Sequence, residues 1–179
     1  MKLYSFVDNH DVDRIISKIN VKEHIYPIYT LLFTLPGIPS VYYGSEWGIR
    51  GRKEGGNDNP LRPAAEIEKV LEEQKDSPIM HWFKWLGEMH KTYRECLAYG
   101  RYRELLLTNR QYAFARFTDN QALLVAVNND EQETEVSISV PFADKVYINL
   151  ETKEKVPVEN GRVQLRIKPA GSILLGINI

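Results

Sequence analysis

Residues 3–11 read Leu-Tyr-Ser-Phe-Val-Asp-Asn-His-Asp, an apolar run that changes to polar side chains within one or two positions. Residues 2–8 predict a short buried strand, and the polar Asn9-His10-Asp11 run that follows is unsuited to continuing it. Residues 24–35 then carry apolar side chains at helical spacing, and Pro36-Gly37 predicts the end of that helix. A strand that leads into a helix in this way is typical of a βα unit.

The same order of elements recurs further along the chain. Residues 40–43 predict a second short strand, and a long polar loop over residues 44–63 follows it. Residues 64–75 and 79–98 predict two further helices, the second from apolar side chains spaced three and four positions apart. We therefore expect residues 1–100 to form βα units with a parallel sheet, and two such units amount to a quarter of an eight-stranded (β/α)8 barrel.

The hydrophobic pattern changes to a period of two at about residue 101. Asp119-Asn120 and Asn160-Gly161 are pairs typical of tight hairpin turns. Short alternating strands at regular spacing favour an antiparallel β-sandwich over residues 101–179, so the predicted fold class is α/β followed by all-β. The predicted strands are residues 103–108, 111–118, 121–127, 134–140, 145–150, 154–158, 162–167 and 171–177.

Composition excludes some classes of function. The chain has 179 residues and a net charge of −1, so no basic surplus favours nucleic acid or an anionic membrane as a partner. Its single cysteine, Cys96, rules out an internal disulfide and slightly favours the cytoplasm, although an exported protein without disulfides fits as well. The apolar run before Asp8 is too short for a signal peptide or a membrane span.

The polar cluster after the first strand is the candidate site. In a βα barrel the catalytic residues lie at the carboxyl ends of the strands. Asn9, His10 and Asp11 would therefore point into the mouth of the barrel, and Tyr43 would lie near the same mouth after the second strand. Arg14 follows the cluster closely.

Two segments carry a specific resemblance. Phe6-Val7-Asp8-Asn9-His10-Asp11, followed by Arg14, resembles a conserved region of the α-amylase superfamily, the family 13 glycoside hydrolases, which lies at the end of barrel strand seven. The Pro36-Gly37-Ile38-Pro39-Ser40-Val41-Tyr42-Tyr43-Gly44-Ser45-Glu46 segment looks like the one that runs into strand eight. The resemblance implies the last two βα units of the barrel plus a C-terminal β domain, covering the whole chain.

The resemblance also implies roles for the candidate residues. His10 matches the histidine that hydrogen-bonds sugar hydroxyls where the bond breaks, and Asp11 matches the acidic residue that stabilises the oxocarbenium-like transition state. Asn9, Arg14 and Tyr43 are expected to bind substrate, which would be an α-glucan or maltooligosaccharide. We expect neither a metal ion nor a cofactor.

The two carboxylates that perform the chemistry in this family are an Asp and a Glu on barrel strands four and five. Those strands would precede Met1, so we expect no hydrolysis by this chain alone. The uncovered strand edges of residues 1–100 predict self-association. The alternative is a free-standing, non-catalytic carbohydrate-binding or assembly module.

Several side chains allow more than one interpretation. The cluster could be an Asx-type turn into a helix with Asp11 or Asp13 as N-cap. Arg14 could hold Asp11 or lie on a solvated helix face, and Asp58 and Arg62 could form an ion pair near the mouth.

The loop after the second strand leaves two more choices open. Trp47 could stack on a sugar, and packing under the loop is the favoured interpretation. The polar run over residues 55–59 could offer oxygen ligands to calcium, but it lacks the ordered spacing of a calcium loop and favours a flexible turn.

Overall fold

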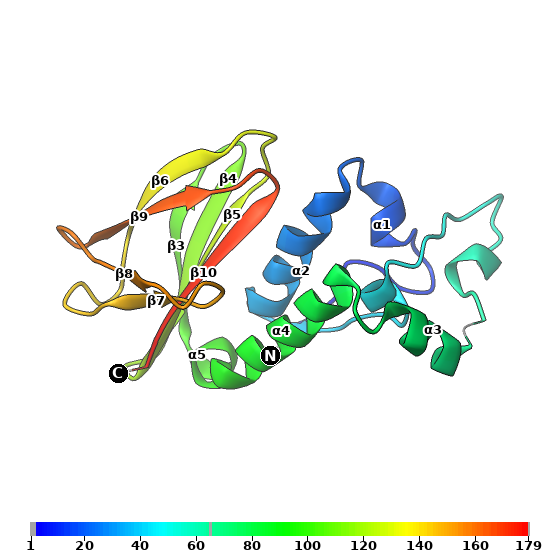
Figure 1. Cartoon of the computed structure of the whole chain (residues 1–179), viewed down its shortest axis with the longest axis horizontal. Coiled ribbons are helices and arrows are strands. Elements are labelled where there is room, and N and C mark those ends of the chain that lie inside the picture. Colours follow the sequence, from blue (N-terminus) through cyan, green and yellow to red (C-terminus); the bar gives the residue numbers. More distant parts are fainter. Residues whose placement is uncertain (1–2, 65, 179) are drawn as a thin grey trace. The chain divides into compact units, whose positions relative to one another are not determined.

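The computed structural model describes residues 3–64 and 66–178 (Figure 1). The chain divides into two units, one of residues 1–33 and 37–88 and one of residues 34–36 and 89–179. The division falls within helix α4, twelve residues ahead of the predicted start of the β domain at residue 101. The division at residue 100 between a barrel part and a sandwich stays a prediction.

The first unit holds helices and two very short strands. They are β1 (Tyr4–Ser5), α1 (Ile15–Lys18), α2 (Ile25–Thr34), β2 (Ile38–Pro39), α3 (Ile67–Gln74), most of α4 (Pro78–Thr92), and 3-10 helices at Lys22–His24, Ser45–Trp47 and Asn59–Leu61. The predicted helices at residues 24–35 and 64–75 are confirmed by α2 and α3. No helix in the described ranges is long and apolar enough to cross a membrane.

The strands of this unit are shorter than expected. The strand predicted over residues 2–8 is reduced to β1, and the strand predicted at residues 40–43 is wrong, because β2 lies just before it. Strands β1 and β2 pair in parallel, with Ser40 N–H donating the last bond of the ladder to the Ser5 carbonyl (2.8 Å). Tyr42 then starts a turn, its carbonyl accepting from Ser45 N–H (3.1 Å). A parallel pair this short does not show the expected partial barrel.

Buried aromatic side chains hold the helices of the first unit together. Tyr29 of α2 is fully buried, and its ring centre lies 4.3 Å from that of Phe83 on α4. Met80, Phe83 and Leu86 recur every three residues on the buried face of α4. The single helix predicted over residues 79–98 is broken at Tyr93, whose backbone (φ −99°, ψ 22°) separates α4 from α5 (Arg94–Tyr99).

The second unit is built on antiparallel strands. A six-stranded sheet has the order β3-β4-β5-β10-β7-β8, and β6 pairs with β9 in a second sheet. All eight predicted strands are confirmed; they are β3 (Arg101–Leu107), β4 (Gln111–Phe117), β5 (Gln121–Asn128), β6 (Thr134–Ser139), β7 (Tyr147–Asn149), β8 (Lys155–Val156), β9 (Arg162–Ile167) and β10 (Gly171–Asn178). Both predicted hairpin turns are present, and Asn160 and Gly161 take positive φ (52° and 73°), as a type I′ turn requires.

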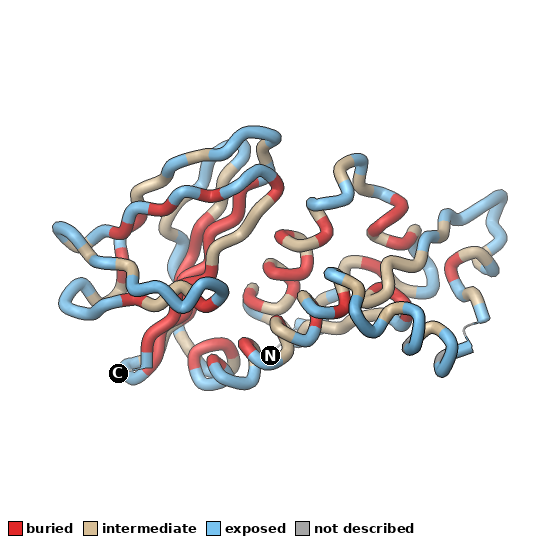
Figure 2. The backbone as a smooth tube through the Cα atoms, viewed as in Figure 1, coloured by how far each residue is buried: buried red, intermediate tan, exposed pale blue. Residues whose placement is uncertain are grey.

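One apolar core lies between the two sheets of this unit. Small side chains of the large sheet, such as Ala113 and Ala126, meet the branched side chains Ile138, Val163 and Ile167 of the small sheet. Strand β5 is buried along its whole length (Figure 2). The antiparallel β-sandwich predicted for the second half is therefore confirmed as a fold.

Candidate functional site

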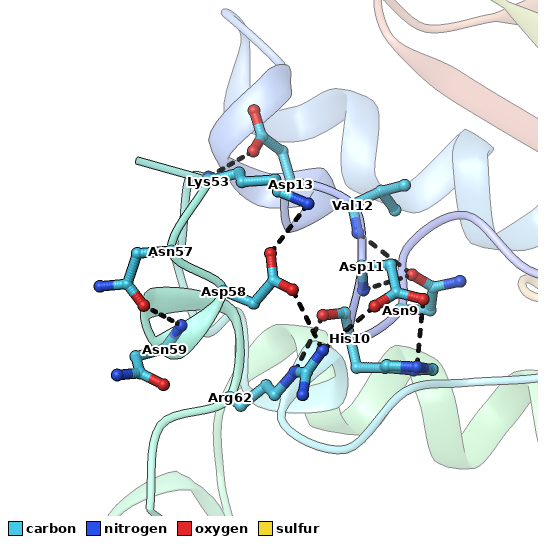
Figure 3. A network of polar contacts seen from close by, with 10 residues as sticks. All are labelled: Asn9, His10, Asp11, Val12, Asp13, Lys53, Asn57, Asp58, Asn59 and Arg62. Carbon is cyan, nitrogen blue, oxygen red and sulfur yellow. Dashed lines mark hydrogen bonds and ion pairs between the residues drawn. The ribbon is translucent and has the colours of Figure 1, made fainter. Parts of the chain in front are cut away.

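The Asn9-His10-Asp11 cluster forms a tight turn on the surface (Figure 3). The Asn9 side-chain oxygen accepts hydrogen bonds from the Asp11 and Val12 N–H groups at 2.8 and 3.2 Å, which is an Asx turn. The turn alternative is thus confirmed, but Asp11 and Asp13 are not N-caps, because α1 starts after Arg14 with no side-chain cap bond from that residue. Asn9 is used to shape the turn.

His10 and Asp11 lie next to each other on the exposed side of this turn. The Asp11 Oδ2 atom lies 3.1 Å from His10 Nε2, and each side chain keeps more than half of its surface exposed. Arg62 donates to the other Asp11 oxygen (3.1 Å) and, through Nε, to the His10 carbonyl (3.0 Å). Arg62 therefore holds both residues of the pair from a loop about fifty positions later in the sequence.

Arg62 is shared with a second carboxylate. It lies 3.3 Å from Asp58, so the ion pair expected between these two residues is confirmed. Lys53 pairs with the other Asp58 oxygen at 2.9 Å, and this hydrogen bond lowers the pKa of Asp58. Two carboxylates and two cations thus surround the rim of the site (Figure 3).

A buried polar cluster lies under the turn. Asp8, the residue before Asn9, is only 2% exposed and accepts from Ser45 Oγ (2.9 Å) and from Ile15 N–H (2.9 Å). Arg14 is fully buried and donates to the carbonyls of Tyr43 (2.8 Å) and Leu61 (3.0 Å). Burying groups of this kind is costly unless they are paired, and here they join the turn to both ends of the 44–62 loop.

Arg14 fits neither of the two alternatives considered for it. It contacts neither Asp11 nor a solvated face, and its guanidinium lies 4.2 Å from the centre of the Tyr42 ring. It positions the loop, and the substrate-binding role expected of it stays a prediction. Tyr43 is exposed, packs its ring on Tyr42 (4.8 Å), and donates its hydroxyl to the Pro63 carbonyl (2.7 Å).

A pocket of about 210 Å³ opens beside His10. It is lined by Tyr4, Phe6, Asp8, Asn9, His10, Ser40, Val41 and Tyr42. The structure thus brings Asn9 and His10 to the pocket wall, places Asp11 beside them, and leaves Tyr43 outside the lining. An imidazole, an aromatic ring and a nearby carboxylate can together hydrogen-bond hydroxyl groups and stabilise positive charge.

Sequence reasoning did not assign the supporting residues Asp8 and Ser45, nor the contact of Arg62 with Asp11. The signal available was the position of Asp8 at the last point of an apolar strand, where a carboxylate should be buried and therefore paired. Residues 54–57 form a turn closed by a bridge between Glu54 and Asn57, which agrees with the expected turn. Within residues 3–64 and 66–178 there is no group of three or more His, Cys, Asp or Glu side chains that could hold a metal ion.

Comparison with known proteins finds relatives for both halves of the chain. The family described as the C-terminal domain of maltogenic amylase matches residues 102–174. Neopullulanase 2 of Thermoactinomyces vulgaris is 24% identical over 97% of this chain and 29% of its own length, and the maltogenic α-amylase of Bacillus acidopullulyticus is 23% identical over 89% and 27%. The chain thus spans less than a third of the length of these curated relatives.

Solved structures match over both units. A cyclomaltodextrin glucanotransferase with a three-domain distribution superposes with a TM-score of 0.82 and 25% identity, covering 99% of this chain and 37% of the other. The α-amylase of Geobacillus thermoleovorans, complexed with acarbose, gives a TM-score of 0.79 at 22% identity, with 99% and 39% covered. Residues 102–174 thus match the C-terminal domain family of maltogenic amylase, and the chain as a whole resembles the C-terminal portion of α-amylase-type glycoside hydrolases.

Proposed function

We propose that this chain supplies one wall of the α-glucan-binding cleft of an α-amylase-type glycoside hydrolase, together with the C-terminal β domain. The observation that carries the proposal is the exposed His10–Asp11 pair at the rim of a pocket, held in place by Arg62. Relatives are named neopullulanase, maltogenic α-amylase and cyclomaltodextrinase, which supports a maltooligosaccharide as the ligand.

The proposed roles follow from the geometry of the rim. Asp11 has one oxygen on His10 and the other on Arg62, so its carboxylate is fixed while much of its surface stays open to a ligand. A fixed carboxylate stabilises a sugar ring that gains positive charge in the transition state. His10 and Asn9 border the pocket, where the imidazole can bind sugar hydroxyls.

The proposal assigns neither the nucleophile nor the acid/base to this chain. A retaining glycosidase needs two carboxyl groups about 5–5.5 Å apart across the scissile bond. Asp11 is proposed as the third acidic group, and the remaining pair is supplied by the part of the relatives that this chain does not cover. The chain on its own is therefore expected to bind sugar without cleaving it.

The finer fold proposal is that residues 1–100 are the last two βα units of a (β/α)8 barrel. The apolar side chains around β1 and β2 support it, because Leu3, Tyr4 and Ile38 are 66%, 67% and 50% exposed. Such side chains need a cover. In a solution of the chain alone that cover is proposed to be a second copy, which is self-association through residues 1–100.

The test is a titration of the 179-residue chain with maltotriose, followed by the backbone amide signals of residues 9–11 in NMR spectra. We expect these signals to shift, and Asp11→Asn to weaken binding about tenfold, since a hydrogen bond to a charged group contributes roughly 1.5–3 kcal/mol. Asp119→Asn is the matched control, because Asp119 is an exposed carboxylate paired with Arg101 as Asp11 is paired with Arg62.

Two further measurements complete the test. Soluble starch should not be hydrolysed by the chain, and turnover that survives Asp11→Ala would overturn the roles assigned above. Light scattering at rising concentration should show association, and Ile38→Lys should reduce it. A clean monomer would contradict the self-association proposal alone.

A further inference from the structure

A second and larger pocket lies in the first unit, away from the residues of the His10 rim. It has a volume of about 330 Å³ and lies between the chain before α2, the loop after β2, and the start of α4. Pockets that bind small ligands run from roughly 300 to 1,000 Å³, so this one has room for a short ligand. It shares no lining residue with the pocket beside His10.

Aromatic side chains form one side of this pocket. Tyr26 and Trp47 line it directly. Behind Tyr26, Trp82 packs edge-on at 5.7 Å, and Trp85 stacks on Trp82 at 4.6 Å. All three tryptophans of the chain therefore gather at or next to this pocket. The flat faces of such rings pack well on the C–H faces of sugar rings.

One of the two lining aromatics carries an unused donor. The Trp47 indole N–H is buried and has no acceptor in the part of the chain that the structure describes. The Trp82 indole, by contrast, donates to the Tyr26 carbonyl at 3.2 Å. An unsatisfied buried donor costs about 1–3 kcal/mol, so a movement of the indole that gives this N–H an acceptor in the pocket is favourable; in the present structure the nitrogen itself is shielded and only other atoms of Trp47 line the pocket.

The lining also includes polar side chains and both signs of charge. Gln74 contributes an amide, and Lys22, Glu23 and Arg50 are exposed at the edge. Within the described residues none of these three charged groups forms an ion pair with the protein, so each is available to a ligand. Two cations and one carboxylate offer both donors and acceptors to the hydroxyl groups of a sugar, and the net positive charge is the reason that an anion is included in the test below.

We infer that this pocket is a second carbohydrate site, which binds a short α-linked glucose oligomer through Tyr26, Trp47 and Gln74. The identity of the sugar rests on the proposed function, whereas the site itself does not use His10 or Asp11. A second site of this kind holds the same glucan at a point outside the cleft and raises its local concentration there.

The experiment is a titration of the full chain with maltotriose, followed by the three indole N–H signals in NMR spectra. The Trp47 signal is assigned by its loss in Trp47→Phe, which keeps an apolar aromatic ring but removes the N–H donor and one ring of the indole. We expect the Trp47 signal to shift in the wild-type chain and Trp47→Phe and Gln74→Ala each to weaken binding at this site about 3- to 10-fold. Trp85→Phe is the matched control, since Trp85 does not line the pocket.

The same spectra separate this inference from the proposed function. Asp11→Asn should leave the Trp47 shift unchanged while it reduces the shifts of residues 9–11. A Trp47 signal that does not move with maltotriose would overturn the inference, as would a shift that disappears in Asp11→Asn. A shift produced by sodium phosphate and not by maltotriose would assign the pocket to anions and overturn it as well.

Discussion

Each of the two units of this chain is stabilised internally by a different kind of contact. In the second unit a continuous apolar core fills the space between two sheets, and strand β5 is buried throughout. In the first unit the strands pair over two residues each, and the loop that carries the candidate site is fixed by the buried polar cluster of Asp8, Arg14 and Ser45. The β domain is thus stabilised by one continuous apolar core, whereas the site-bearing unit combines packed aromatic side chains with a buried polar cluster and exposes Leu3, Tyr4 and Ile38.

This difference predicts where a single substitution is most costly. A buried charged network is destabilised strongly when one member is removed, because the partners remain buried and unpaired. An apolar core loses only the transfer and cavity terms of the deleted atoms. The position of all three tryptophans in the first unit lets the two units be followed separately, by fluorescence and by the β-sheet circular dichroism signal.

The largest effect is expected for Arg14→Ala. The substitution leaves the Tyr43 and Leu61 carbonyls without their donor and opens a cavity, which costs roughly 3–5 kcal/mol in the first unit. In urea titrations the tryptophan transition should move to lower denaturant while the sheet signal keeps its midpoint. Arg52→Ala is the control, because Arg52 lies in the 44–62 loop that Arg14 contacts but is itself exposed. Equal shifts of both signals would show that the units unfold together and would remove the contrast.

Leu124→Ala is the counterpart in the second unit. Leu124 is 1% exposed in the core between the sheets, so its truncation should cost roughly 2–5 kcal/mol. The sheet signal should now move and the tryptophan signal should keep its midpoint. Leu107→Ala, at a position that is 65% exposed, should have almost no effect. A tryptophan transition that follows Leu124→Ala would again contradict independent units.

The same contrast explains which parts of the molecule could be predicted from sequence. The strands of the β domain were predictable because alternation is a local pattern and one face of each strand meets a single core. The strand expected at residues 40–43 was wrong, since a parallel strand is defined by its partner, and β1 ends at Ser5. The helix expected over residues 79–98 kept its pattern through the break at Tyr93.

The candidate site was predictable only in part, for a related reason. The Asn9-His10-Asp11 cluster was visible because chemical groups adjacent in sequence stay adjacent in the fold. Which arginine supports Asp11 depends on how the long loop returns, and the sequence suggested Arg14 for Asp11 and Arg62 only for Asp58. In the structure Asp11 pairs with Arg62, and Arg14 is buried. Contacts that depend on how a long loop folds back therefore cannot be assigned from the sequence alone.

A smaller effect is expected for Gly176→Ala in the β domain. A Cβ atom at Gly176 would overlap the hydroxyl and ring of Tyr93, which is buried and cannot move away freely. Overpacking of this kind costs roughly 1–3 kcal/mol, and the sheet signal should report it. Gly87→Ala in α4 is the matched control, because its Cβ would meet nothing, and alanine there should stabilise the helix by about 0.5–1 kcal/mol. Equal stability of the two variants would contradict the packing described for β10.

The smallest effect is expected on the pKa values of two exposed carboxylates, one in each unit. Lys53 lowers the pKa of Asp58 at the rim, and Lys145 lowers that of Asp144 in the β domain, both from an ordinary value of 3.8. A lowered pKa stabilises the folded state above the unfolded value, and this contribution is lost as the pH falls below about 4 through the folded pKa. NMR titrations that follow the carboxyl carbons should show the pKa of Asp58 rising toward 3.8 in Lys53→Ala, and the pKa of Asp144 rising toward 3.8 in Lys145→Ala.

The two carboxylates should nevertheless differ, because only Asp58 has a second cation. In Lys53→Ala the Arg62 guanidinium remains 3.3 Å away and should keep the pKa of Asp58 below its ordinary value, whereas Asp144 retains only a backbone hydrogen bond. If the two substitutions gave the same pKa change, Arg62 would not be shared between Asp58 and Asp11, and the support proposed for the rim would be lost.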